Sequence, residues 1–195
     1  MQTLRSAVAL VATAIGFGVS FFMLQSAIGT ASPWLGLLLM FYFMGLAKVA
    51  EPLFMLRIPK ALKAVRAWET SGPAYGRLAV HRFGKVLRNT PLRHLNSSVY
   101  LANRRSDLRT LYRYAESAEA IHFWAMVLFT PYIAFVWLQR QVVLTSVFVL
   151  IQLLFNIYPI LHLRTLRGRL DELLVRQHAK RHTKPVAGDA TNRLR

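Results

Sequence analysis

The sequence is dominated by apolar runs whose length matches a lipid bilayer. The first run, 6–28, contains no charged residue, and a helix of that length crosses a hydrocarbon core about 30 Å thick. Three more runs follow, at 34–56, 118–138 and 142–163. Together the runs predict an all-α integral membrane protein with about four transmembrane helices.

Composition and charge agree with a membrane protein. The chain has 195 residues, of which 54% are hydrophobic, and a formal net charge of +17, a combination that is unusual for a soluble domain of this size. Lysine and arginine avoid the apolar runs and gather between them, as they do in bilayer proteins. We therefore expect membrane lipid and anionic lipid headgroups as partners, and no nucleic acid. The chain has no cysteine, which excludes disulfides and thiolate chemistry.

The distribution of positive charge predicts the topology. Segment 57–117 carries thirteen Lys and Arg residues and the tail from Arg164 carries nine, whereas the two short connections between runs carry none and one. Because positively charged loops stay in the cytoplasm, we place this segment and both termini on the cytoplasmic side. The membrane is then expected to be the cell inner membrane. Residues 1–182 are then a single multi-pass membrane domain, and 183–195 are a disordered tail.

The segment between the second and third runs is predicted to be basic, cytoplasmic and partly helical. Its first part, 57–68, interleaves basic and apolar residues and predicts an amphipathic helix along anionic headgroups. Glycines and prolines then break the periodicity around His81, in a loop that is either a solvated cap or part of a site. We keep His81 as a candidate substrate-binding residue. From Ser106, with Asp107 behind it, a helix is expected to start and to continue into the third run.

Two ionisable side chains, Glu119 and His122, lie in the third run. Such groups cost about 2.5 kcal/mol or more at membrane depth, and their spacing of three places them on nearly one helix face. In one interpretation they are catalytic: Glu119 orients the imidazole and raises its basicity, and His122 takes a proton from a hydroxyl as it attacks a carbonyl. In another, Glu119 pairs with an arginine such as Arg164. Metal binding by this Glu-x-x-His pattern needs a second copy and further glutamates, so we expect no metal.

The fourth run brings further polar residues to the depth of this pair. Only three residues separate the third and fourth runs, so the two spans form an antiparallel hairpin, and Asn156 and Tyr158 lie level with the ionisable pair. Pro159 lacks a backbone donor and frees the carbonyl of Phe155, which predicts an irregular, polar turn. Asn156 and Tyr158 are expected to bind either the molecule that carries the attacking hydroxyl or the carbonyl group that it attacks.

Three arginines, Arg164, Arg167 and Arg169, follow the polar turn. By themselves they are typical of the positive stop after a last span. Beside a lipid-facing pocket, several guanidinium groups would bind the phosphates of an acyl-CoA or of a lipid headgroup. We therefore take them as candidate residues for binding an anionic donor.

The motifs at these positions resemble a known family. The sequence AEAIH at 118–122, Pro131 and the sequence NIYPILHLRTLRGRL at 156–170 are similar to the glycosyl-4,4'-diaponeurosporenoate acyltransferases, small membrane enzymes of carotenoid tailoring. Five residues upstream also match the family pattern: Glu69, Gly72, Tyr75, Val80 and Phe83. Three residues beside the arginines depart from it: Leu163, Thr165 and Leu166.

The resemblance implies an O-acyltransferase that moves a fatty acyl group to a sugar hydroxyl of a lipid-like acceptor, a glycosylated carotenoid. We expect acyl-CoA as the co-substrate and no bound cofactor. The residues alone leave an alternative, a non-enzymatic interaction or assembly protein with a basic cytoplasmic face. A transporter is disfavoured, because the first run has no ionisable group and no matching pair of broken helices occurs.

Overall fold

All secondary structure in the described part of the chain is helical. A computed structural model describes residues 2–30, 32–54, 56–66, 68–69, 75, 80–90 and 107–182. The elements in chain order are α1 (Gln2–Ile28), α2 (Pro33–Phe54), α3 (Lys60–Lys63), α6 (Val80–Asn89), α8 (Leu108–Leu138), α9 (Val142–Gln152), the π-helix η2 (Leu153–Ile157) and α10 (Tyr158–His182). No strand occurs within these ranges, which confirms the all-α prediction.

Within the described ranges, four helical stretches are long and apolar enough to cross a membrane, as predicted. They are Ala7–Ile28, Pro33–Glu51, Leu108–Leu138 and Val142–Ala179. The last stretch joins α9, η2 and α10 into one rod of 38 residues, about 57 Å long. The helix therefore continues far beyond the predicted end of the fourth span. The tail predicted at 183–195 lies outside the described residues.

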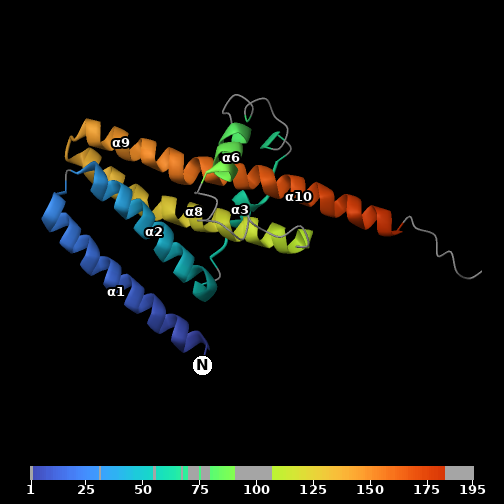
Figure 1. Cartoon of the computed structure of the whole chain (residues 1–195), viewed down its shortest axis with the longest axis horizontal. Helices are drawn as coiled ribbons and strands as arrows, with labels where there is room; N and C mark the ends of the chain where they lie inside the picture. Colours follow the sequence, from blue (N-terminus) through green and yellow to red (C-terminus); the bar gives the residue numbers. More distant parts are fainter. Residues whose placement is uncertain are drawn as a thin grey trace, which may run out of the picture.

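The spanning helices form two antiparallel hairpins (Figure 1). One consists of α1 and α2, and the other of α8 and the α9–η2–α10 rod. Helix α8 packs against α2 and against α10, whereas α1 packs against α2 at the edge of the bundle. Helix α6 lies on α10, where a Cβ atom on Gly84 would overlap the His162 ring. Helix α8 is therefore the central element, and α10 carries the part of the structure outside the spans.

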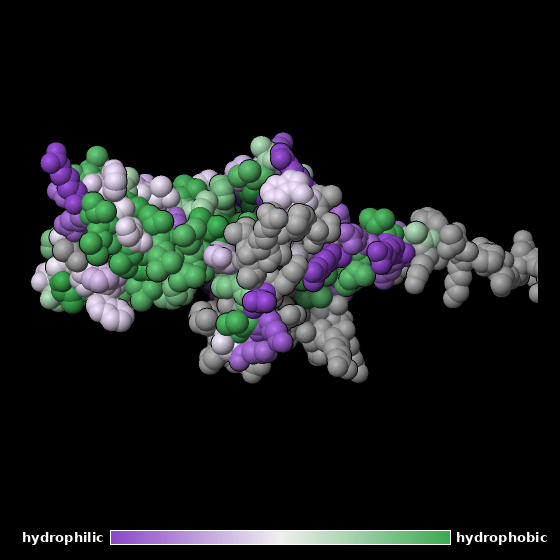
Figure 2. All heavy atoms as spheres, turned by 90° about the horizontal axis from the view of Figure 1, so that it is seen from above, coloured by the Kyte–Doolittle hydropathy of each residue, from purple (hydrophilic) through white to green (hydrophobic). Residues whose placement is uncertain are grey.

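The molecular surface divides by polarity along the long axis (Figure 2). Hydrophobic side chains cover the half that contains the two hairpins, and hydrophilic ones gather toward α3 and the end of α10. On α1, large apolar side chains such as Val11, Ile15 and Val19 are more than half exposed. An exposed apolar surface of this size is expected where lipid covers the protein.

The core joins α2, α8 and α9. Its fully buried members include Leu35, Met40, Phe129 and Phe148. Gly36 lets α2 approach α9 closely, because a Cβ atom there would overlap the Phe148 ring. Small residues play this role at many contacts between membrane helices.

Gly36→Val is expected to destabilise the bundle by about 1–3 kcal/mol, the usual cost of overpacking a filled core. The apparent melting temperature of the detergent-solubilised protein measures the effect. Gly16→Val is the matched control, because no atom lies within 4 Å of a Cβ atom built on Gly16. Equal melting temperatures for the two variants would contradict the close packing of α2 on α9.

Helix α3 is much shorter than the amphipathic helix predicted for 57–68. It ends at Lys63, and the hydrogen bonds that would extend it are made elsewhere. The backbone N–H of Arg66 donates to Glu69 Oε2 at 2.7 Å, and the carbonyl of Leu62 accepts from Arg164. In a continuous α-helix these two backbone groups would pair with each other. The Arg164 side chain of α10 and the nearby Glu69 side chain therefore stop this helix.

Candidate active site

The predicted residue Glu119 lies at the contact between α8 and α10, and its side chain is 1% exposed. Its carboxylate accepts from two arginines of α10: Arg164 Nη1 donates to Oε1 at 3.0 Å, and Arg167 Nη1 donates to Oε2. No hydrogen bond between Glu119 and His122 occurs among the described contacts. The structure thus agrees with the interpretation in which Glu119 pairs with arginine.

A second carboxylate, that of Glu69, completes the charge balance. Arg164 binds it with two parallel hydrogen bonds, Nε to Oε1 at 3.0 Å and Nη2 to Oε2 at 2.9 Å. Two carboxylates and two guanidinium groups therefore meet in one place, which we call the ion cluster: Glu69, Glu119, Arg164 and Arg167. Buried charges are tolerated only when they are paired and hydrogen-bonded in this way.

Arg164 has no donor to spare. A guanidinium has five N–H groups, and those of Arg164 reach Glu69 twice, Glu119 once, and the backbone carbonyls of Leu62 and Ala64. An anionic substrate could bind Arg164 only by displacing one of these partners. The arginine instead ties α10 to α8 and to the segment around α3.

Arg167 is more deeply buried than Arg164 but less completely bonded. It donates to the carbonyl of Lys63 at 2.9 Å and to the hydroxyl of Tyr112 at 3.2 Å, and its guanidinium lies over the Tyr112 ring, 5.3 Å from the centroid. Its Nε atom is buried without a partner in the described ranges. Arg169, the third predicted arginine, is exposed, because two residues of α-helix turn it to the opposite face from Arg167.

The second predicted residue, His122, lies beside Asn156, as the hairpin topology predicts. Its ring interacts with the Asn156 side chain and with the backbone of Phe155. These contacts fall short of full hydrogen bonds, since Nδ1 of His122 and Oδ1 of Asn156 are buried and lack one to any described residue. The side chain of Asn156 has no solvent exposure. His122 is thus set against a neutral amide, away from the charges that Glu119 binds.

The chain next to Asn156 is irregular, which confirms the prediction from Pro159. The π-helix η2 runs from Leu153 to Ile157, and the N–H of Tyr158 donates to the carbonyl of Leu153, five residues back. Single π-helical turns inside α-helices are frequent at functional sites. Here the turn carries Asn156 into the contact with α8.

Gln152 was not predicted and holds Asn156 in place. Its Oε1 accepts from Asn156 Nδ2 at 2.7 Å, and its Nε2 donates to the carbonyl of Met126 at 3.0 Å. Two amides four residues apart in an otherwise apolar run share a helix face, and this spacing was the signal in the sequence. For Glu69 the sequence carries two signals: it matches the family pattern, and it is one of three acidic residues in the basic segment 57–117.

Two predicted residues remain, Tyr158 and His81, and only the side chain of Tyr158 is described. The ring of Tyr158 packs against Phe83 of α6, with 5.4 Å between centroids, so it faces away from the His122–Asn156 contact. His81 belongs to α6, but its side chain lies outside the described part of the structure.

Tyr75, one of the residues matching the family pattern, is buried next to the ion cluster. Its ring packs against Trp68, and its hydroxyl has no hydrogen-bond partner among the residues that are described. Burial, and next the negative charge of Glu69, raise the pKa of Tyr75. The hydroxyl therefore stays protonated and available as a donor.

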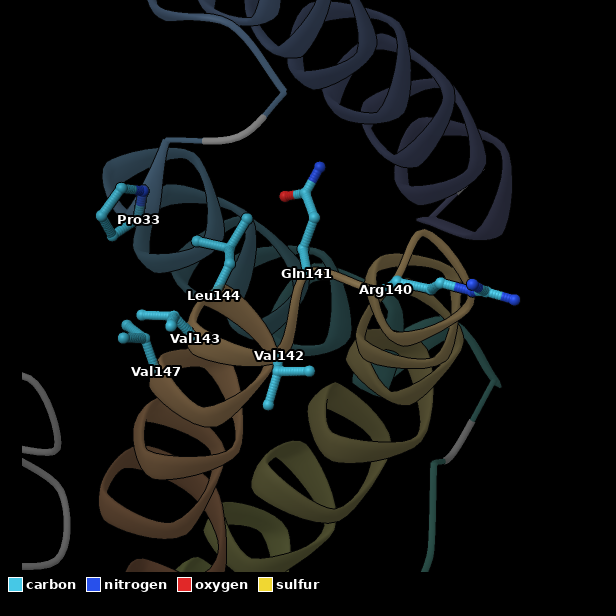
Figure 3. Close-up of a pocket in the computed structure, with 7 residues that line it drawn as sticks. All are labelled: Pro33, Arg140, Gln141, Val142, Val143, Leu144 and Val147. Atoms are coloured by element: carbon cyan, nitrogen blue, oxygen red, sulfur yellow. The ribbon is translucent and has the colours of Figure 1, made fainter.

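An open cavity lies at the other end of the bundle. It measures about 550 Å³ and is lined by Pro33, the α8–α9 turn and the start of α9 (Figure 3). Arg140 of this turn points away from the other lining side chains. His122 precedes Leu138, the end of α8, by 16 residues, or about 24 Å of helix, so the cavity is separate from the His122–Asn156 contact.

Comparison with known proteins identifies the family to which the chain belongs. The family model described as glycosyl-4,4'-diaponeurosporenoate acyltransferase matches residues 59–176, which is more than half of the chain and contains the ion cluster, His122, Gln152 and Asn156. No curated protein and no solved structure matches the sequence. The chain therefore belongs to the glycosyl-4,4'-diaponeurosporenoate acyltransferase family, and it is a membrane enzyme of the acyltransferase class.

Proposed function

We propose that this protein transfers a fatty acyl group from acyl-CoA to a sugar hydroxyl of a lipid-like acceptor, with a glycosylated carotenoid as the acceptor class that the family name indicates. The observation that carries the proposal is the imidazole of His122 in a spanning helix, half-buried with its Nδ1 atom enclosed, which interacts with Asn156 and bonds to no charged group among the described residues. A neutral imidazole in such a place can act as a general base.

The reaction needs one proton transfer. His122 takes the proton of the sugar hydroxyl while the hydroxyl oxygen attacks the thioester carbonyl. The tetrahedral intermediate then collapses to an ester, the carbon–sulfur bond breaks, and the CoA thiolate receives the proton from the imidazolium. The transfer is redox-neutral, so this chemistry needs no further reactant.

The depth of His122 suits a substrate with a polar head and an apolar body. The residue lies about 24 Å along the helix from the α8–α9 turn, near the far boundary of a core about 30 Å thick. A sugar head would reach that boundary while its apolar part stays among lipids. Acyl-CoA would approach from water, where Arg169 is exposed and can meet its phosphates.

We place this boundary on the cytoplasmic side of the cell inner membrane, with both termini in the cytoplasm. The charge distribution supports this orientation, and the absence of cysteine from the chain makes it simple to test. Arg140→Cys and Lys85→Cys each introduce one exposed thiol. A membrane-impermeant maleimide is expected to label Cys at 140 from outside the inner membrane, and Cys at 85 only after that membrane is opened. The reverse pattern would overturn the orientation.

Lipid extracts test the proposed reaction. Cells that contain the protein are expected to hold a lipid that cells lacking it do not, heavier than its precursor by a fatty acid minus water. Mild alkali should convert this lipid back to the precursor, because the new bond is an ester. Mass spectrometry identifies the acceptor and the acyl chain together. Identical extracts from the two kinds of cell would contradict the proposal.

A further inference from the structure

The orientation of the Gln152 amide is fixed by a partner that can only accept. Gln152 lies 3.0 Å from the backbone carbonyl of Met126 on α8, and Thr130 Oγ1 lies 3.4 Å from the same nitrogen. Because a carbonyl oxygen has no proton to donate, the Gln152 atom that faces it is Nε2. The amide oxygen Oε1 must therefore point the other way.

The Gln152 amide in turn fixes that of Asn156. Oε1 of Gln152 lies 2.7 Å from the Asn156 side chain, and an amide oxygen requires a donor at that distance. The facing atom is therefore Nδ2, and Oδ1 of Asn156 points away from Gln152. Oδ1 is a buried acceptor for which the described residues provide no hydrogen bond.

His122 provides the matching donor. Its ring interacts with the Asn156 side chain and with the backbone of Phe155, and its Nδ1, like Oδ1 of Asn156, is a buried atom that lacks a hydrogen bond to the described residues. Neutral imidazole carries its proton on one nitrogen only. A proton on Nδ1 supplies the donor that Oδ1 of Asn156 lacks, whereas a proton on Nε2 leaves both buried atoms as acceptors without a donor, which is costly.

We propose that Gln152 sets the tautomer of His122 through Asn156. The proton lies on Nδ1, and Nε2 keeps its lone pair for the substrate hydroxyl. Gln152 touches no reacting atom, so it is a positioning residue, and its effect on catalysis rests on the proposed function. The assigned tautomer is a property of the protein without substrate and can be measured separately.

Gln152→Leu tests the assignment, because leucine leaves Asn156 free to turn its amide over. The ¹⁵N spectrum of histidine-labelled protein in nanodiscs reports the tautomer, and the His122 signals are those missing from His122→Ala. We expect the Nδ1–H form in the wild type and a mixture of tautomers in Gln152→Leu. A base in the wrong tautomer is ineffective, so kcat should fall about tenfold or more while KM for the acceptor changes less than about twofold.

Thr145→Val is the matched control. Thr145 is also buried on α9, but among the described residues its hydroxyl bonds only to the carbonyl of Gln141, one turn back. The variant removes a buried polar group from the same helix and should leave both the histidine spectrum and kcat unchanged. A loss of kcat in Thr145→Val equal to that in Gln152→Leu would overturn the specific role of Gln152.

Rescue separates positioning from packing. In the double variant Gln152→Leu with Asn156→Asp, both carboxylate oxygens are acceptors, so no second residue is needed to orient the group. The Nδ1–H form should return, together with most of the kcat lost in Gln152→Leu. Asn156→Asp alone should be impaired, because its carboxylate meets Oε1 of Gln152. A double variant no better than Gln152→Leu would overturn the assignment, as would an unchanged spectrum in Gln152→Leu.

The two proposals fail in different ways. If Gln152→Leu changes the tautomer but His122→Ala still transfers the acyl group at the wild-type rate, the tautomer assignment stands and the proposed base is wrong. If His122→Ala abolishes transfer while Gln152→Leu keeps the Nδ1–H form, the proposed base stands and the role of Gln152 is overturned.

Discussion

Glu119→Gln is expected to destabilise the folded protein by about 3–5 kcal/mol, the usual cost of breaking a buried ion pair from one side. The variant leaves Arg164 and Arg167 with a single carboxylate, Glu69, and turns an amide NH₂ group toward guanidinium donors. The amount of protein in membranes and its apparent melting temperature in detergent measure the effect. Glu172→Gln is the matched control, since Glu172 is an exposed acid on α10. Equal melting temperatures would contradict the structural role of Glu119.

A double variant tests whether the charge itself is the cause. Glu119→Leu with Arg167→Leu removes one charge of each sign and leaves the Arg164–Glu69 pair intact. Replacing a whole buried pair by apolar residues is often neutral, whereas removing one partner is not. The double variant should therefore be more stable than Glu119→Leu alone. A double variant that is less stable than the single one would show that packing, not charge balance, dominates.

His122→Ala is expected to lower the rate of acyl transfer by about 100-fold or more, the contribution of a positioned general base. Unlike Glu119, His122 has no ion pair in the described structure, so its loss leaves no buried charge unbalanced. The protein should accumulate in membranes to a near-normal level. Transfer per mole of protein is the quantity to measure.

His178→Ala is the control for this second prediction. His178 is an exposed histidine on α10 that contacts Arg109, far along the rod from η2. Its replacement should leave the transfer rate unchanged. A His122→Ala protein as active as His178→Ala would remove His122 from the mechanism.

The two sets of polar residues near the α8–α10 contact have separate tasks in this account. The ion cluster uses charge to hold α8, α10 and the segment around α3 together. In the proposed mechanism, the uncharged groups of His122, Asn156 and Gln152 form and orient the general base. Glu119→Gln should therefore act mainly on stability and His122→Ala mainly on rate.

The sequence predicts the spans because hydrophobic length is a local property. It also predicts the meeting of His122 and Asn156, since a three-residue connection forces the third and fourth helices into a hairpin. Pro159 predicts the irregular turn for an equally local reason, its missing backbone donor. These features need only the order of residues within one or two helices.

The partners of Glu119 depend on contacts that are distant in sequence. Arg164 bonds to Glu69, 95 residues away, and to the carbonyl of Leu62, 102 residues away. Glu119 and His122 share a helix face, so their spacing suggested a pair, but spacing cannot show that two arginines compete for the carboxylate. The helix predicted for 57–68 is too long partly for the same reason, because Arg164 of α10, 102 residues from Leu62, and the nearby Glu69 take the hydrogen bonds that would extend α3.

Acyl transfer by the purified protein tests the central claim most directly. Wild-type protein and His122→Ala protein, each in nanodiscs, would receive a lipid extract of the protein's own cells and acyl-CoA labelled in the acyl group. The account predicts that the wild type moves the label into a lipid from which mild alkali releases it as fatty acid, and that His122→Ala does so about 100-fold more slowly or less. Label that stays in acyl-CoA with the wild type, or equal transfer by both proteins, would contradict it.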